Sequence, residues 1–119
     1  MKPLLLVLLL GSNLFAAERT YVGWVSDSRC ARARASAGAF TATDPDCARE
    51  CIKEGHKIVF ISPETKTVFA VENPEALKAQ VGNKVRISGI ERGTRLLHVN
   101  EVLSSTKENP ECERPPLKQ

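Results

Sequence analysis

Short runs of apolar and β-branched residues alternate along the chain with turn-forming residues, which is the pattern of a protein built mainly from β-strands. Each run is bounded by Gly, Pro, Asn, Asp or Ser. The expected strands span residues 20–28, 57–62, 67–72, 84–90 and 95–105. The alternation of the last strand breaks near Asn100 and Glu101, which predicts a β-bulge at that point.

Two short helices are expected between the strands. Each has a capping residue, a proline at the first helical position and a glycine after its last turn. These signals occur at Asp44, Pro45 and Gly55, and again at Asn73, Pro74 and Gly82. Residues 29–43 are Ala, Arg, Ser and Thr with few others and have no clean apolar stripe, so a long irregular loop is expected there.

The order of these elements predicts the fold class. Five strands, with a helical insert after the first and a short helix between the third and fourth, follow the order of an OB-type barrel. The expectation is a mainly β protein with two short helices, folded as a five-stranded OB-like small barrel. A small β-sandwich with two helices uses the same strands and is the alternative. The residues expected to point inward are Val22, Trp24, Ile58, Phe60, Val68, Ala70, Leu77, Val85, Ile87, Leu97 and Val99.

The N-terminal segment of the chain predicts export. Residues 1–17 combine a basic start, an apolar run and small residues before a charged pair, which is typical of a secretory signal peptide. The run is too short for a membrane span, so no stable span is expected after cleavage, and the location is periplasmic or extracellular. An uncleaved anchor is the alternative, because Phe15 stands where a small residue is preferred. Residues 18–105 form the expected OB-like domain, with a loop and helix insert at 27–55, and residues 106–119 form a flexible polar, Pro-rich tail.

The charge balance gives no general drive toward nucleic acid. The chain has 17 Lys and Arg against 14 Asp and Glu, and only one of the basic residues lies within residues 1–17. Locally, Arg29, Arg32 and Arg34 form a cluster that is either a solvated loop or an anion-binding surface. Asp27 belongs to the same candidate ligand surface, or it caps the turn after the first strand.

Four cysteines in a small exported domain favour disulfides. Cys47 and Cys51 lie at i and i+4 of one expected helix, so a bridge between them is strained and distant partners are favoured. We expect Cys30–Cys51, which joins the loop to the helix, and Cys47–Cys112, which ties down the tail. The pairing of Cys30 with Cys47 and of Cys51 with Cys112 stays open.

Metal binding is the alternative use of the same residues. The spacing of Cys47, Cys51 and His56 resembles the ligand run of dinuclear copper sites, with the histidine one residue late. Thiolate and imidazole suit copper or zinc, and Cys30 could complete a zinc site. Such ligands must escape oxidation in an exported protein.

No catalytic constellation is found, and the protein is not expected to be an enzyme or to carry a cofactor. The chain contains no nucleophile elbow, zinc-protease helix motif or phosphate loop. A catalytic thiol at Cys47 is disfavoured, because several carboxylates of its own helix oppose a thiolate.

The stretches "YVGWVSDSRC", "CARECIKEGHKIVFI", "NKVRISGI" and "LLHVNEV" resemble a family of small exported bacterial proteins of unknown function. Members share a G-W-x-S-D-S-x-C pattern followed by C-x-x-x-C, and the likeness covers about residues 20–105. The resemblance implies an OB-like fold and export, and no established activity. A glycine and then a histidine commonly follow the first cysteine, whereas this chain has Ala31, Arg32 and Arg34 there. Any metal ligand at that histidine is missing from this chain.

The expected function is therefore an exported, disulfide-stapled OB-like binding or envelope-associated module. Its partner is an unidentified ligand or envelope protein, and not nucleic acid. The alternative is a periplasmic metal-handling protein for copper or zinc that uses Cys30, Cys47, Cys51 and His56.

Overall fold

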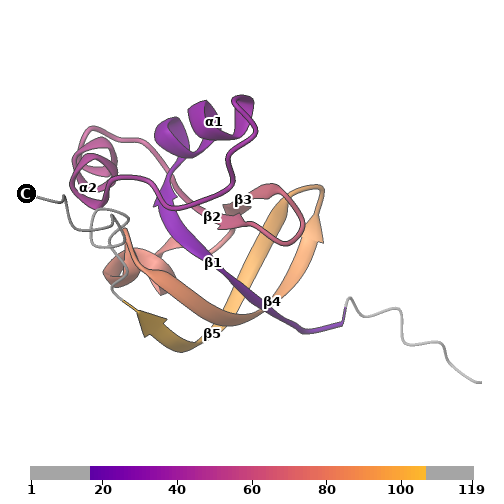
Figure 1. The fold of residues 1–119 in the computed structure, drawn as a ribbon. Helices are drawn as coiled ribbons and strands as arrows, with labels where there is room; N and C mark the ends of the chain where they lie inside the picture. The colour runs from indigo at the N-terminus through magenta and orange to yellow at the C-terminus, as the bar shows by residue number, and fades with distance from the viewer. Residues whose placement is uncertain (1–16, 107–119) are drawn as a thin grey trace, which may run out of the picture.

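The computed structural model describes residues 17–106 of the chain, so the expected tail and nearly all of the expected signal peptide lie outside the described residues. Figure 1 shows the arrangement of the elements. In chain order they are β1 (Arg19–Asp27), α1 (Ser28–Ser36), α2 (Pro45–Lys53), β2 (Ile58–Ser62), β3 (Thr67–Val71), the 3-10 helix η1 (Pro74–Gln80), β4 (Lys84–Gly93) and β5 (Leu96–Thr106).

The five strands form one sheet that closes on itself in the order β1-β2-β3-β5-β4, with β4 returning to β1. Neighbouring strands are antiparallel except for β3 and β5, which run parallel where Ala70 lies opposite Leu96. α1 and α2 both belong to the β1–β2 connection and lie together on one side of the sheet (Figure 1). The expected mainly β class is confirmed. The described residues contain three helices, however, where two were expected.

The additional helix is α1, in a segment where an irregular loop was expected. The carboxylate of Asp27 starts this helix by accepting a hydrogen bond from the backbone N–H of Cys30 at 3.0 Å. Only Ala31 of the helix is buried, so α1 packs on the sheet through one small residue and needs no apolar stripe. The segment between α1 and α2 is held against β1 by a buried hydrogen bond between the hydroxyls of Ser26 and Thr43.

α2 begins and ends as its sequence signals predict. The side chain of Asp44 accepts hydrogen bonds from the backbone N–H groups of Asp46 and Cys47, and Pro45 occupies the first turn. Gly82 fixes the start of α2 against the rest of the fold. A Cβ on Gly82 would lie 2.6 Å from the Cβ of Pro45, and the φ of Gly82 is +89°. Both observations require glycine at this point of close approach.

η1 lies where the second helix was expected, but the side chain of its N-cap residue Asn73 makes no capping hydrogen bond. The Asn73 amide instead reaches β5, donating to the carbonyl of Val99 at 2.7 Å and accepting from its N–H at 2.8 Å. This pair of bonds attaches η1 to the sheet. Leu77 of η1 is thereby held in the core, as expected.

The inward face was predicted correctly for most of the sheet and wrongly for β1 and β3. Val22 is 45% exposed and Trp24 is only half-buried, while Tyr21 and Val25 point inward. In β3 the inward residue is Phe69, so Val68 and Ala70 lie on the outer face. Both strands carry apolar residues at consecutive positions, so alternation alone does not decide which set faces in. The expected residues that are buried are Ile58, Phe60, Leu77, Val85, Ile87, Leu97 and Val99.

The expected β-bulge in the last strand is confirmed. Glu101 pairs with Ser88 and Val99 pairs with Gly89, so Asn100 is the extra residue between them. A second shift in the pairing of β4 with β5 occurs at Leu103. Bulges increase the bend and twist of a strand, which lets β5 pair with β4 along most of its length and with β3 at its start.

Candidate functional site

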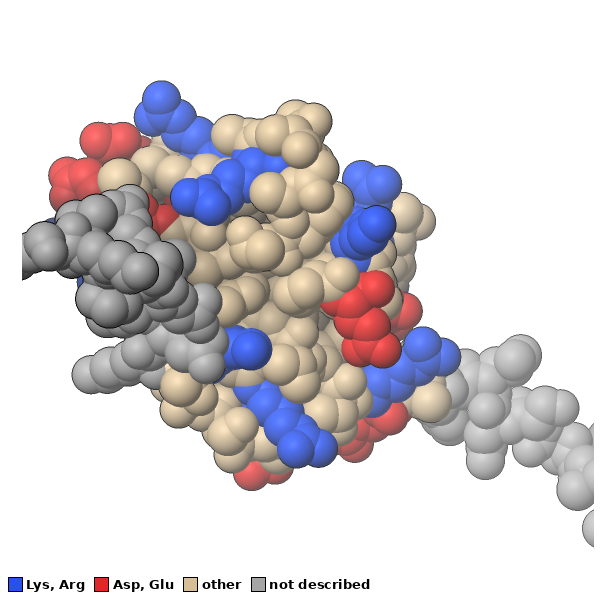
Figure 2. Space-filling view, in the orientation of Figure 1, with Lys and Arg blue, Asp and Glu red and all other residues tan. Residues whose placement is uncertain are grey.

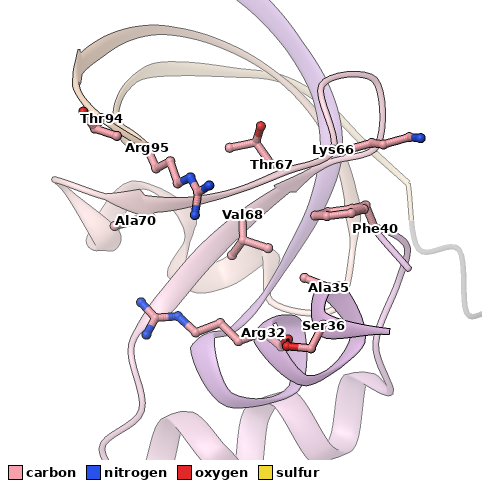
Figure 3. Close-up of a pocket in the computed structure, with 10 residues that line it drawn as sticks. All are labelled: Arg32, Ala35, Ser36, Phe40, Lys66, Thr67, Val68, Ala70, Thr94 and Arg95. Atoms are coloured by element: carbon pink, nitrogen blue, oxygen red, sulfur yellow. Dashed lines mark hydrogen bonds between the residues drawn. The ribbon is translucent and has the colours of Figure 1, made fainter. Parts of the chain in front are cut away.

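A groove of about 720 Å³ lies between α1, β3 and the turn that joins β4 to β5. It therefore combines parts of the chain that are far apart in the sequence. Figure 3 shows the residues around it. They are Arg32, Ala35, Ser36, Phe40, Lys66, Thr67, Val68, Ala70, Thr94 and Arg95.

Three basic side chains reach the groove from three different elements: Arg32 from α1, Lys66 from the β2–β3 turn and Arg95 from the β4–β5 turn. In Figure 3 the side chains of Arg32 and Arg95 extend toward the same space from opposite sides. None of the three takes part in a salt bridge within the described residues. Their positive charge is therefore available to a ligand.

The floor of the groove is apolar. Val68 and Ala70 supply it from the outer face of β3, where Val68 also packs against the small apolar cluster of Ala31, Val59 and Ile61. Phe40, from the segment between α1 and α2, is half-buried at one end of the groove. The groove thus offers a ligand both positive charge and apolar contact.

Only one member of the expected arginine cluster lines this groove. Arg32 does so, while Arg29 and Arg34 are exposed elsewhere on α1. Across this face of the molecule, basic side chains are scattered with acidic ones among them, rather than gathered in one stripe (Figure 2). Lys66, Arg95 and Phe40 were not among the predicted site residues. The sequence predicts turns at Lys66 and Arg95, but it does not predict that these two turns lie beside the same groove.

A second cavity, of about 810 Å³, lies next to the first and shares Arg32 and Ala70 with it. His56 is in its lining, together with Glu72. The Glu72 carboxylate lies 3.6 Å from Arg92 Nε and 3.4 Å from His98 Nδ1. This cavity is mixed in charge, so the first groove is the better site for an anion.

Asp27, Cys30 and Cys51 form a cluster where the end of β1, the first turn of α1 and the last turn of α2 meet. One potential ligand atom from each lies within 4.8 Å of the other two. Asp27 ends β1 and is fully buried, Cys30 is half-buried in the first turn of α1, and Cys51 is 9% exposed in the last turn of α2. Asp27 therefore lies apart from the exposed arginines and in the interior.

The Asp27 carboxylate is only partly satisfied. Its Oδ2 accepts the capping hydrogen bond from Cys30, whereas its buried Oδ1 has no hydrogen-bond partner among the described residues. The pKa of the Cys30 thiol is raised to about 12, first by burial, then by the nearby Asp27 carboxylate, and then by Cys51. Cys30 is thus held as the neutral thiol.

Cys47 and His56 do not join this cluster. Cys47 is exposed on α2, and its pKa is raised chiefly by the negative charge of Asp44. This agrees with the expectation that acidic neighbours oppose a thiolate there. His56 lies beyond Gly55, outside the helix, in the second cavity. Of the expected metal ligands, the structure brings together Cys30 and Cys51 and adds Asp27.

The expected disulfides stay predictions. Cys30 and Cys51 are free thiols in the structure and are close neighbours. Cys47 is also a free thiol, and its expected partner Cys112 lies outside the described residues.

Comparisons with known proteins give no assignment. No protein-family model matches the chain, and neither the curated proteins nor the solved structures include a match to it. Within residues 17–106, no helix has the length and apolar character needed to cross a membrane.

Proposed function

We propose that this protein is an exported, OB-like binding module that holds an anionic oligosaccharide in the groove between α1, β3 and the β4–β5 turn. The strand order, the parallel pairing of β3 with β5 and the helix between β3 and β4 support an OB-like barrel. OB barrels bind oligosaccharides and oligonucleotides on the face of strands 2 and 3, between the β1–β2 and β4–β5 connections. The groove lies over β3, between residues of the β1–β2 connection and the β4–β5 turn, which supports this comparison. Export rests on the signal-peptide pattern of residues 1–17.

The observation that carries the proposal is that Arg32 and Arg95 extend toward the same space of one apolar-floored groove, with Lys66 in its lining (Figure 3). Three cations that form no salt bridge within residues 17–106 attract carboxylate, sulfate or phosphate groups when they line one site. The apolar floor suits the flat face of a sugar ring. A nucleic acid is disfavoured, because the groove has one aromatic side chain and the chain is nearly neutral overall.

The backbone at two of these residues supports a role in binding. Lys66 has a φ of 49° and Arg95 a φ of 55°, which is the left-handed region that glycine and asparagine favour. Residues with a side chain bear a cost in this conformation. Long basic residues at both positions, beside the same groove, are explained by a need for their charge.

The binding proposal predicts which arginines matter. In a calorimetric titration with a heparin-derived oligosaccharide, Arg32→Ala or Arg95→Ala should weaken binding about 10- to 150-fold each, since a charge-assisted contact contributes about 1.5–3 kcal/mol. Arg29→Ala and Arg34→Ala are the matched controls on α1 and should change affinity less than about twofold. Raising the salt concentration should weaken binding of the original chain. Equal losses at Arg34 and Arg32 would mean non-specific charge attraction, and an absence of binding would refute the proposal.

A second prediction separates stability from binding at the two turns. Lys66→Gly and Arg95→Gly should each leave the unfolding free energy in urea unchanged or raise it by up to about 1 kcal/mol, because glycine relieves the left-handed conformation. The same variants should bind the oligosaccharide less tightly. A loss of stability in either variant would contradict the argument that the left-handed conformation is costly at these residues. Unchanged oligosaccharide binding by the double variant Lys66→Gly/Arg95→Gly would contradict their role in binding.

A further inference from the structure

We propose that Asp27, Cys30 and Cys51 form a Zn²⁺ site in the reduced protein, separate from the groove and independent of its ligand. In tetrahedral zinc sites, Zn–S distances of about 2.3 Å and Zn–O distances of about 2.0 Å place ligand atoms roughly 3.5–3.8 Å apart. The three atoms here already lie within 4.8 Å of one another. Side-chain adjustments of about 1 Å are enough to bring them onto one ion.

The unpartnered oxygen of Asp27 points to a cation. Its residue is fully buried, and Oδ1 has no hydrogen-bond partner among the described residues. A buried carboxylate oxygen without a partner is costly and rare in folded proteins. The other oxygen is already used to cap α1. A metal ion bound between Oδ1 and the two sulfur atoms would satisfy the carboxylate without disturbing the cap.

The set of ligands selects the kind of ion. Two thiolates exclude Mg²⁺ and Ca²⁺, which take oxygen ligands. Cu⁺ prefers sulfur alone, whereas Zn²⁺ accepts thiolate and carboxylate together. Binding displaces the two thiol protons to solvent and leaves both sulfurs as zinc-bound thiolates, with no change of oxidation state. Three protein ligands leave a fourth position for water or a small ligand, beside the half-exposed Cys30.

The three ligands come from elements that the fold already holds in place. Asp27 pairs with Ile58 at the end of β1, and it caps the helix that carries Cys30. Cys51 is on α2, whose start is packed against Gly82. An ion here would join β1, α1 and α2. It would therefore stabilise the folded state by mass action.

Titration of the fully reduced chain with Co²⁺, followed by displacement with Zn²⁺, tests the site. We expect one ion per chain, a thiolate-to-cobalt absorption band and a rise in melting temperature with Zn²⁺. Cys30→Ser and Cys51→Ser should each lower affinity at least about a hundredfold and remove about half of the band, because each deletes one of two thiolates. Asp27→Asn keeps an oxygen that can cap α1, so it should fold, retain the band and bind about 10–100-fold more weakly.

Cys47→Ser is the matched control, since Cys47 is on the same helix as Cys51 but exposed. It should bind as the original chain does. Loss of binding in this variant would overturn the assignment in favour of a site at Cys47, and unchanged affinity in Asp27→Asn would remove the carboxylate from it. A reduced, folded chain that takes up no ion would refute the site. Circular dichroism of each ion-free variant establishes that it is folded.

Discussion

Replacing Gly23 with alanine should destabilise the protein by about 3 kcal/mol or more, or prevent folding altogether. A Cβ at this position would lie 1.9 Å from the backbone oxygen of Ile61 and 2.8 Å from the ring of Phe60. A rotamer change can move a ring atom, but the backbone oxygen belongs to β2, which pairs with β1 next to this point. Relief therefore requires the two strands to separate.

Urea unfolding followed by circular dichroism measures this effect. Gly93→Ala is the matched control, because the nearest atom to a Cβ there is the Leu96 Cβ at 4.0 Å. It should change the unfolding free energy by less than about 0.5 kcal/mol. If Gly23→Ala were as stable as Gly93→Ala, the close approach of β1 to β2 would be wrong.

Truncating Phe60 should cost about 3–5 kcal/mol. Its side chain is fully buried, and its ring lies edge-on to Tyr21 at 6.3 Å between centroids and 6.4 Å from Phe69. These three rings fill the centre of the closed sheet, so Phe60→Ala leaves a cavity that the surrounding strands cannot collapse into. That loss is a large share of the roughly 5–15 kcal/mol by which a domain is stable.

Phe40→Ala is the comparison for this prediction. Phe40 is half-buried at the edge of the groove, so its truncation should cost less than half as much in urea unfolding. It should also weaken oligosaccharide binding, which Phe60→Leu should leave unchanged if that variant folds. Equal stability losses at the two phenylalanines would contradict the placement of the core.

Signals that act over a few residues made much of the fold predictable. Asp44 and Pro45 start α2, and the bulge at Asn100 follows from a broken alternation. Both the helix start and the bulge depend on residues close to them in the sequence, so a local pattern is enough to predict them. α1 was missed because its one strong signal, the Asp27 cap, was not followed by an apolar stripe, and its packing needs only Ala31.

The predictions of which residues point into the core were wrong in strands that carry apolar residues on both faces. In β1, Tyr21 and Val22 are adjacent and either could be buried. The close packing at Gly23, which brings β2 against its inner face, is a tertiary fact that no local pattern contains. In β3, the choice of Phe69 over Val68 follows from the aromatic cluster at the centre of the sheet.

The candidate sites were predictable only in part, because both depend on distant segments meeting. Arg32 was a candidate from its local cluster, but Lys66 lines the same groove only because α1 packs near β3, and Arg95 only because β5 pairs with β3. The spacing of Cys47 and Cys51 suggested that both could bind the same metal ion. The packing of α2 turns Cys51 inward, toward Cys30, and leaves Cys47 in solvent.

The pairing of β1 with β4 also constrains when the protein can fold. Val22 lies opposite Arg86, so the sheet closes only after most of the domain is available to the chain. Contacts between residues so far apart in sequence form slowly, because a long loop must be ordered first. We therefore expect the sheet of a nascent chain to close only after β4 has been synthesised.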